Sequence, residues 1–418
     1  MRKWMIRCLL SLSGTGVFAA SPGFFERCVV WDANEDGIPV YHVPTIAVTN
    51  KGTVLAAADA RYGDLSDFGP HHIVVKRSLD GGRTWSRSNY VARSDHGQIY
   101  LFPNFIQPRE GGPIFLFYAE KDAADIHHIS HVWMRSSADD GLSWTDPREI
   151  TSILVDADAK LGEAVRAGTA GPQFRRDNYL LYGRRAFFPG PGVAIQLRAD
   201  DAAAPGRMLV PVLGMKDRWV YTIQRGQFNT FIVSDDGGKT WKAGGTVPIG
   251  GEANCEPSIV ETDDGGILMN ARVEDQSYRV VSTSGNGGAT WTVARKDGSL
   301  PEYGQIHSGL LRYSFARSDP TRTSRVLFSF PDSPRRENLN VWMSYDNCRS
   351  WAVRKVVDPG PSFYSNMALL PDHTILVIYG RDQRPDAGPL MGFPARTVVA
   401  RFNLEWLSDG ADGPAGRR

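Results

Sequence analysis

A short motif recurs five times along the chain and restricts its fold more than any other feature of the sequence. Three copies read Ser-x-Asp-x-Gly-x-Thr/Ser-Trp and are centred on Asp80, Asp139 and Asp236, and weaker copies are centred on Asn286 and Asp346. Successive centres lie 50 to 97 residues apart, and each copy follows a short apolar run typical of a β-strand. Similarity at this period indicates a repeat architecture.

Each copy of the motif has the chemistry of a hairpin end. The Asp or Asn side chain bonds the backbone two residues on, glycine supplies a positive φ, and tryptophan packs beneath the turn. The period suits a four-stranded propeller blade with its loops. We therefore predict an all-β chain, a six-bladed β-propeller over residues 24–407 followed by a flexible tail over 408–418. The 97-residue gap after Asp139 is expected to hold one blade without the motif. These turns, the Asp boxes of such folds, are assigned a structural role and no catalysis.

Charge and composition exclude two classes of protein. Among 418 residues, 47 Lys and Arg oppose 46 Asp and Glu, and a net charge of +1 gives no support to a nucleic-acid binder. No apolar run reaches the roughly 18 residues of a membrane-spanning helix. The 43 Gly and 26 Pro residues suit a turn-rich β-protein.

The N-terminus has the composition of a signal peptide. Three cations lie within residues 1–7, an apolar run follows over residues 8–20, and Val17 and Ala19 are small enough for cleavage after Ala19. We expect residues 1–19 to be removed and the protein to be secreted or periplasmic. The alternative is a disordered or core-packed first segment.

Cysteine and histidine positions carry little information about binding. Removal of the leader leaves Cys28, Cys255 and Cys348, an odd number that permits at most one disulfide. No recognised ligand spacing accompanies the small histidine cluster, so we expect no metal and no cofactor. No glycine-rich phosphate loop opens a helix, which disfavours a nucleotide enzyme. The clustered histidines are His127, His128 and His131.

Several chemically active residues are predicted to lie at the propeller rim opposite the repeated turns, because the two strands of a hairpin begin and end at the same edge of a blade. Glu256 begins an apolar run that turns at residues 263–266 and returns to Arg272, so antiparallel pairing brings both residues to one end of a blade. The same parity places further polar residues at this rim, namely His42, Arg61, Asp67, Arg336, Tyr364 and Arg381.

This set of side chains suits glycoside chemistry on an acidic sugar. Two arginines facing one cavity match a ligand carboxylate. A carboxylate beside a tyrosine can accept the phenol proton and create a nucleophile, while a desolvated carboxyl group can serve as a general acid. Tyrosine nucleophiles occur in glycoside hydrolysis, and a carboxylate nucleophile would be repelled by a substrate carboxylate.

The motifs resemble the exo-sialidases, or neuraminidases, of bacteria and animals over about residues 38 to 406. The repeated turns are shared by many propellers, whereas the Glu256–Arg272 and Arg336–Tyr364 patterns are more specific. The resemblance rests on segments spread along the chain, namely Tyr41-His42-Val43-Pro44, Asn254-Cys255-Glu256, Asn270-Ala271-Arg272 and Phe363-Tyr364-Ser365.

The resemblance implies a retaining exo-α-sialidase-like hydrolase that acts on sialylated glycans as a monomer. Tyr364 resembles the nucleophile, Glu256 the carboxylate that activates it, and Asp67 the general acid/base. Asp64 is the competing choice for the acid. Residues expected to contact the sugar are His42, Arg61, Asp125 and its neighbour Asp122, Arg272, and Arg336 with Arg335 as its alternative; Arg279 is expected to be a strand residue.

Two departures from the family pattern fall on one ion pair. The family binds the sugar carboxylate with a clamp of three arginines, whose second and third members resemble Arg272 and Arg336. At the position of the first arginine this chain has His42, and at the position of the glutamate that pairs with it this chain has Gly380. We expect His42 to donate to an anion, and as an imidazolium it would lose affinity as pH rises. Arg381 is a candidate for the missing charge, and His42→Arg with Gly380→Glu is expected to rebuild the family arrangement. The altered clamp leaves open a hydrolase of another 2-keto sugar acid, Kdn or Kdo, or a carbohydrate-binding propeller without catalysis.

Overall fold

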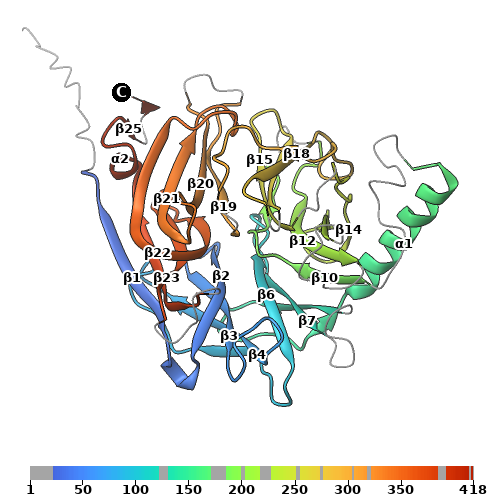
Figure 1. Cartoon of the computed structure of the whole chain (residues 1–418), viewed down its shortest axis with the longest axis horizontal. Coiled ribbons are helices and arrows are strands. Elements are labelled where there is room, and N and C mark those ends of the chain that lie inside the picture. Colours follow the sequence, from blue (N-terminus) through green and yellow to red (C-terminus); the bar gives the residue numbers. More distant parts are fainter. Residues whose placement is uncertain are drawn as a thin grey trace, which may run out of the picture.

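The computed structural model describes residues 22–121, 130–170, 185–198, 203–216, 227–250, 255–273, 276–303, 306–317, 322–384, 392–413 and 416–417. Within these residues, antiparallel strands form six four-stranded blades arranged around a common centre (Figure 1). The predicted all-β fold is confirmed.

Five blades use strands that follow one another in the chain. The first blade contains β2 (Val40–Val48), β3 (Val54–Arg61), β4 (His71–Ser78) and β5 (Asn89–Ala92). The second contains β6 (Ile99–Ile106), β7 (Ile114–Lys121), β8 (Ser130–Ser137) and β9 (Arg148–Glu149). The third contains β10 (Arg185–Pro189), β12 (Met208–Lys216), β13 (Gln227–Ser234) and β14 (Lys242–Ala243), with β11 (Ile195–Gln196) beside β12. The fourth contains β15 (Cys255–Glu261), β16 (Ile267–Arg272), β17 (Arg279–Ser284) and β18 (Arg295–Lys296).

The fifth and sixth blades share the long strand β22 (Val353–Leu369). Its first half pairs with β21 and its second half with β23. The fifth blade also contains β19 (Gly309–Ser314), β20 (Arg325–Pro331) and β21 (Glu337–Ser344), and the sixth contains β23 (Ile375–Gln383), β24 (Pro394–Phe402) and β1 (Phe25–Asp32).

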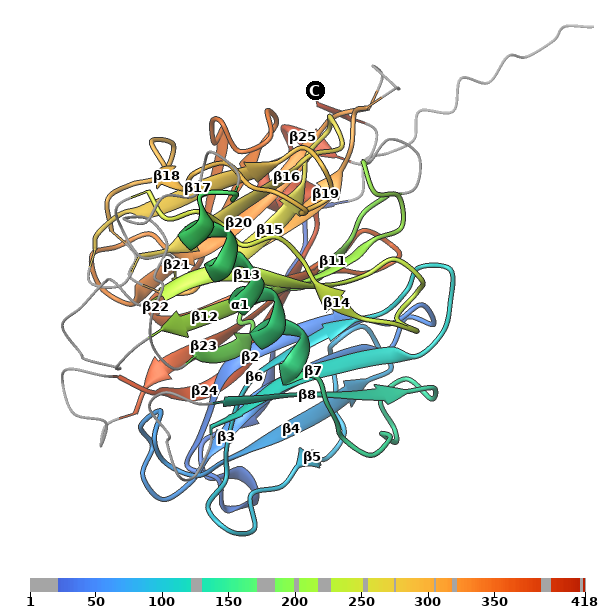
Figure 2. The same ribbon diagram turned by 90° about the vertical axis from the view of Figure 1, so that its right-hand side faces the viewer.

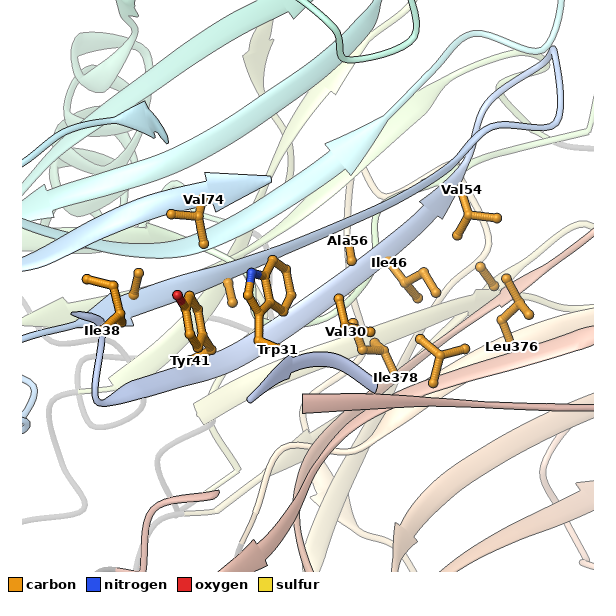
Figure 3. Packing of buried hydrophobic residues seen from close by; sticks show 14 of the residues in the cluster. Val30, Trp31, Ile38, Tyr41, Ile46, Val54, Ala56, Val74, Leu376 and Ile378 are labelled. Atoms are coloured by element: carbon orange, nitrogen blue, oxygen red, sulfur yellow. The ribbon is translucent and has the colours of Figure 1, made fainter. Parts of the chain in front are cut away.

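The N-terminal strand β1 closes the ring by pairing with β24, so that Phe25 lies opposite Phe402. Behind this seam, apolar side chains of the first and sixth blades form one core in which Trp31 is fully buried (Figure 3). Burial of apolar surface between blades stabilises the folded state by about 25 cal/mol per Å². The first and last strands of the propeller are therefore held in the same sheet.

The repeated turns lie between the third and fourth strands of the first five blades. In the first copy, Ser78 Oγ donates to Asp80 and the carboxylate of Asp80 accepts from the amide and hydroxyl of Thr84 at 2.9 and 2.7 Å. The box tryptophans pack beneath; the Trp241 ring meets Phe117 edge-on at 4.9 Å. The bond from this backbone amide to the central Asp or Asn recurs in the other four copies.

The predicted position of the blade without the motif was wrong. The gap between Asp139 and Asp236 contains helix α1 (Thr151–Ala167) and the strands β10 to β13 of the third blade, which carries its turn at Asp236. Helix α1 lies on the outside of the propeller against β8, β10 and β14 (Figure 2). The blade without the motif is the sixth. Its third and fourth strands, β24 and β1, come from opposite ends of the chain, so no turn joins them.

The predicted flexible tail is also corrected where residues are described. After the short helix α2 (Leu404–Leu407), the chain packs on the propeller and forms β25 (Asp412–Gly413), which pairs with β26 (Gly416–Arg417). The side chain of Asp412 is buried and accepts from Arg325 Nε at 2.7 Å and from Tyr345 Oη at 2.8 Å. A buried guanidinium requires such a partner, and the tail supplies it.

Other expectations concern parts of the chain that the structure describes only partly. The proposed leader, residues 1–19, lies outside the described residues. Among the helices that are described, none is long and apolar enough to cross a membrane. Within the described residues, Cys28 and Cys348 form no disulfide. A short 3-10 turn, Glu35–Gly37, precedes the first blade.

Candidate active site

Four of the inner strands are bulged at the rim opposite the repeated turns. The register breaks between His42 and Thr45 in β2, Leu101 and Asn104 in β6, Cys255 and Pro257 in β15, and Ser362 and Ser365 in β22. Glu256 and Tyr364 are themselves bulge residues, and Glu256 has a φ of 27°. Bulges re-aim side chains, and backbone strain of this kind concentrates at functional sites.

Tyr364, Glu256 and Arg272 form one hydrogen-bonded group. Tyr364 Oη donates to Glu256 Oε1, while Arg272 Nη1 lies 3.1 Å from Glu256 Oε2 and 3.2 Å from Tyr364 Oη. Tyr364 and Glu256 are buried. The structure thus brings together three residues that hairpin parity placed at one rim.

The electrostatics around Tyr364 favour a protonated phenol at rest. Burial and the adjacent carboxylate of Glu256 raise its pKa well above the ordinary value, and Arg272 and Arg336 act in the opposite direction. Formation of the phenolate therefore requires a proton acceptor in contact, and Glu256 occupies that position.

Arg336, the expected third cation, acts on the same site. It lies in the segment before β21, is half-buried, and exerts an electrostatic effect on Tyr364 and His42. Its neighbour Arg335 is exposed. Arg279 is buried in β17, where it donates to Asn270 and to the carbonyl of Ile306, as expected for a strand residue.

Asp67 forms an ion pair with Arg61. Its Oδ1 is 2.8 Å from Arg61 Nη1, and its side chain is 47% exposed. Desolvation opposes ionisation of Asp67, but Arg61 and Lys121 outweigh it and hold its pKa below the usual range. The competing candidate, Asp64, is exposed and caps the backbone amide of Ser66.

Asp59 belongs to this group and was missed in the sequence. It lies two residues before Arg61 on β3, faces His42 in the pairing with β2, and is fully buried. Its Oδ2 is 3.5 Å from Arg61 Nη2, and its Oδ1 accepts from the amide of Phe102. The Asp59-Ala60-Arg61 spacing, which puts both charges on one face of a strand, was the available signal.

His42 lies in an aromatic environment. Its ring centre is 5.2 Å from that of Tyr364, 5.8 Å from Phe393 and 6.4 Å from Phe363. Burial, followed by the positive charges of Arg61 and Arg336, lowers its pKa well below the ordinary value. These effects favour the neutral ring, which can both donate and accept a hydrogen bond, over the imidazolium.

The structure also corrects the expectations for Gly380 and Arg381. A Cβ atom at Gly380 would lie 2.9 Å from the Cβ atoms of both Phe363 and Pro394, so a glutamate does not fit there without movement. Arg381 Nε donates to Asp358 at 2.7 Å, and its Nη1 pairs with Asp382. Arg381 thus pairs with Asp358 and Asp382 and does not replace the positive charge that is missing at His42.

Some candidate residues cannot be placed. Asp122 and Asp125, and also His127 and His128, lie outside the described residues. His131 contacts Glu149 through Nδ1 at 2.9 Å. In the part of the chain that is described, no three His, Cys, Asp or Glu side chains gather as a metal site would require.

Comparisons with known proteins agree with this architecture. Residues 52–377 match the family of BNR repeat-like domains. The chain is 32% identical over 392 residues to a sialidase of Micromonospora viridifaciens, covering 89% of this chain and 53% of that protein. An exo-alpha-sialidase of Arthroderma benhamiae is 22% identical, with 90% of this chain and 86% of that protein covered. The chain spans about half the length of the first relative and 61% of a sialidase of Bacteroides fragilis.

Solved structures show the same fold at low sequence identity. The Hadza microbial sialidase Hz136 superposes with a TM-score of 0.68 at 19% identity, over 92% of this chain and 69% of that one. The intramolecular trans-sialidase from Ruminococcus gnavus gives 0.65 at 17% identity, over 91% and 98%.

Proposed function

The chain belongs to the BNR repeat-like domain family and has sialidases among its relatives, and from this premise we propose that it is a retaining exo-glycosidase that releases terminal sialic acid from glycoconjugates. The observation that carries the proposal is the contact of the Tyr364 phenol with Glu256, bridged by Arg272.

The proposed reaction has two steps, each with a defined proton path. Tyr364 Oη transfers its proton to Glu256 and attacks the anomeric carbon, while Asp67 in its protonated form donates to the departing glycosidic oxygen. Arg61 and Lys121 make that form of Asp67 the minor one near neutral pH. Asp67 then takes a proton from water as the water attacks the same carbon, and Tyr364 leaves and regains its proton from Glu256. Two inversions give overall retention.

Tyrosine suits this task for an electrostatic reason. A substrate with a carboxylate on the anomeric carbon repels an approaching carboxylate, whereas the phenol arrives neutral and loses its proton only as the bond forms. Arg272 lies within 3.2 Å of Tyr364 Oη, and Arg336 acts on the same phenol. These cations stabilise the developing phenolate and supply partners for the sugar carboxylate.

A second candidate is favoured by the altered clamp. At His42 and Gly380 the site has a neutral imidazole and packed apolar side chains, so a related 2-keto sugar acid such as Kdn or Kdo is the alternative substrate. We further propose export through residues 1–19 and action as a monomer.

Release assays on one purified sample test the proposal. Aryl glycosides of sialic acid, Kdn and Kdo are compared, and NMR reports the anomer formed first. Release of sialic acid as the α-anomer supports the proposal; preferential release of Kdn or Kdo favours the alternative. Binding without release by any of the three would indicate a carbohydrate-binding propeller.

A further inference from the structure

A single guanidinium in the site serves two carboxylates. Arg61 Nη1 lies 2.8 Å from Asp67 Oδ1, and Arg61 Nη2 lies 3.5 Å from Asp59 Oδ2. The side chain of Arg61 is 2% exposed, that of Asp59 is fully buried, and that of Asp67 is 47% exposed. Only Asp67 of this trio is open enough to meet a substrate, and Asp59 has no part in the reaction proposed above.

We propose that Asp59 is a positioning residue that sets the proton affinity of Asp67 through the guanidinium they share. This role rests on the proposed function of Asp67 as general acid. Arg61 carries one positive charge that it does not lose. When Asp59 is ionised, the Arg61 guanidinium interacts with two carboxylates and stabilises that of Asp67 less, so Asp67 holds its proton more readily. When Asp59 is protonated, the full charge acts on Asp67 and favours its carboxylate.

The surroundings of Asp59 bring its pKa close to neutral pH. Burial raises the pKa of Asp59 to about 7, although Arg61 and the amide of Phe102 act in the opposite direction. Four titratable groups surround the Asp59–Arg61 pair from other elements, namely Asp67 from the loop before β4, His42 from β2, His71 from β4 and Lys121 from β7.

The protonation of these neighbours determines which charges lie near Asp59. Burial lowers the pKa values of His42 and His71, so both rings are neutral near pH 7. Burial also lowers the pKa of Lys121 to about 8, which leaves it mostly cationic at neutrality; its Nζ donates to the backbone carbonyl of Asp67. Arg61 is therefore the group that contacts both carboxylates.

The test compares leaving groups that do and do not need a proton. Asp59→Asn keeps an oxygen for the Phe102 amide but removes the charge, so Arg61 acts on Asp67 alone. At pH 8, where Asp59 of the parent is mostly ionised, kcat/KM for 3′-sialyllactose should fall about tenfold, the effect of one pKa unit on Asp67. The value for 4-methylumbelliferyl sialoside, whose phenol leaves as an anion, should change by less than about threefold. Equal losses on both substrates would overturn the proposal.

A matched control separates this effect from the loss of any buried carboxylate. Asp412 is as buried as Asp59 and pairs with Arg325 in a blade contact outside the site. Asp412→Asn should leave the ratio of the two kcat/KM values unchanged, whatever it does to thermal stability. A change in that ratio equal to the one in Asp59→Asn would also overturn the proposal.

Asp67→Asn, measured in parallel, separates this proposal from the proposed function. If Asp67→Asn harms both substrates equally, the general-acid assignment fails. If it spares the aryl sialoside and Asp59→Asn does not, only the role of Asp59 fails.

If Asp59→Asn does not fold, a pH profile of the parent protein still tests the proposal. Its ratio of sialyllactose to aryl kcat/KM should fall by clearly less than about tenfold per pH unit between pH 6 and 8, because ionisation of Asp59 raises the proton affinity of Asp67. A uniform tenfold fall per unit would contradict the proposal.

Discussion

Tyr364 and Glu256 are joined by a hydrogen bond although 108 residues separate them in the chain. Each lies in a bulge of an inner strand, one in the sixth blade and one in the fourth. In a regular strand successive side chains alternate between faces. The bulges change that alternation locally and bring the phenol and the carboxylate together at the rim.

Removal of the phenol oxygen should abolish turnover and leave the fold intact. We expect Tyr364→Phe to lower kcat for an aryl sialoside by at least about 10²-fold, and Glu256→Gln to act similarly because an amide cannot accept the phenol proton. Tyr379→Phe is the matched control, since Tyr379 is also buried and donates to a carboxylate, Asp358, outside the site. Unchanged hydrolysis in Tyr364→Phe would remove the nucleophile assignment.

The tryptophans of the repeated turns should affect stability and not chemistry. Trp241 is buried against Phe115 and Phe117. Trp241→Ala is expected to lower the free energy of unfolding by about 3–5 kcal/mol. Urea denaturation gives this value, and kcat of the folded fraction should stay near that of the parent. Intact stability with lost activity would contradict the separation of the two rims.

Rebuilding the family ion pair should fail at Gly380. A side chain there meets Phe363 and Pro394, so Gly380→Ala should lower the melting temperature, and Gly380→Glu should lower it further. The double variant His42→Arg/Gly380→Glu should be less stable than His42→Arg alone. Differential scanning fluorimetry on the parent and the four variants tests this order. A double variant that melts above the single one would show that the pocket adapts.

The contribution of His42 to substrate affinity should not depend on pH between about 6.5 and 8. Burial and the nearby positive charges of Arg61 and Arg336 hold its pKa well below 6.5, so the ring is neutral throughout this range. His42→Ala should raise KM for an aryl sialoside by a constant factor of roughly 2–10, the value of one hydrogen bond. A parent KM that rises through pH 6–7, with the step absent in His42→Ala, would indicate an imidazolium.

Buried neutral histidines should make the protein less stable in mild acid. Burial lowers the pKa of His307 to about 3 in the folded state, against about 6.5 when unfolded. Its contribution is therefore complete above pH 6.5 and is lost as pH falls below that value, by up to about 1.4 kcal/mol per pH unit. Urea denaturation at pH 7.5, 6 and 5 measures the slope, which should be smaller in His307→Gln. An equal slope in both proteins would exclude His307 as a source.

Much of the site was accessible from the sequence because hairpins follow strict geometry. Glu256 and Arg272 lie at the same end of β15 and β16 since antiparallel strands return to their start. The contact between Glu256 and Tyr364 was not accessible in this way, because it joins different blades across the centre of the ring. Asp59 was overlooked since a buried carboxylate within an apolar strand acquires a role only through Arg61 and Asp67.

The repeat, the β-class and the rim that carries the chemistry could be predicted from the amino-acid sequence, because they depend on local turns and on the pairing of neighbouring strands. Which blade lacks the turn depends on the folded chain, since β1 pairs with a strand that is far away in the sequence. The protonation of His42 and the absence of room for a side chain at Gly380 also depend on the folded chain. Burial and charge at His42, and the free space at Gly380, are properties of side chains that fold around them from distant segments.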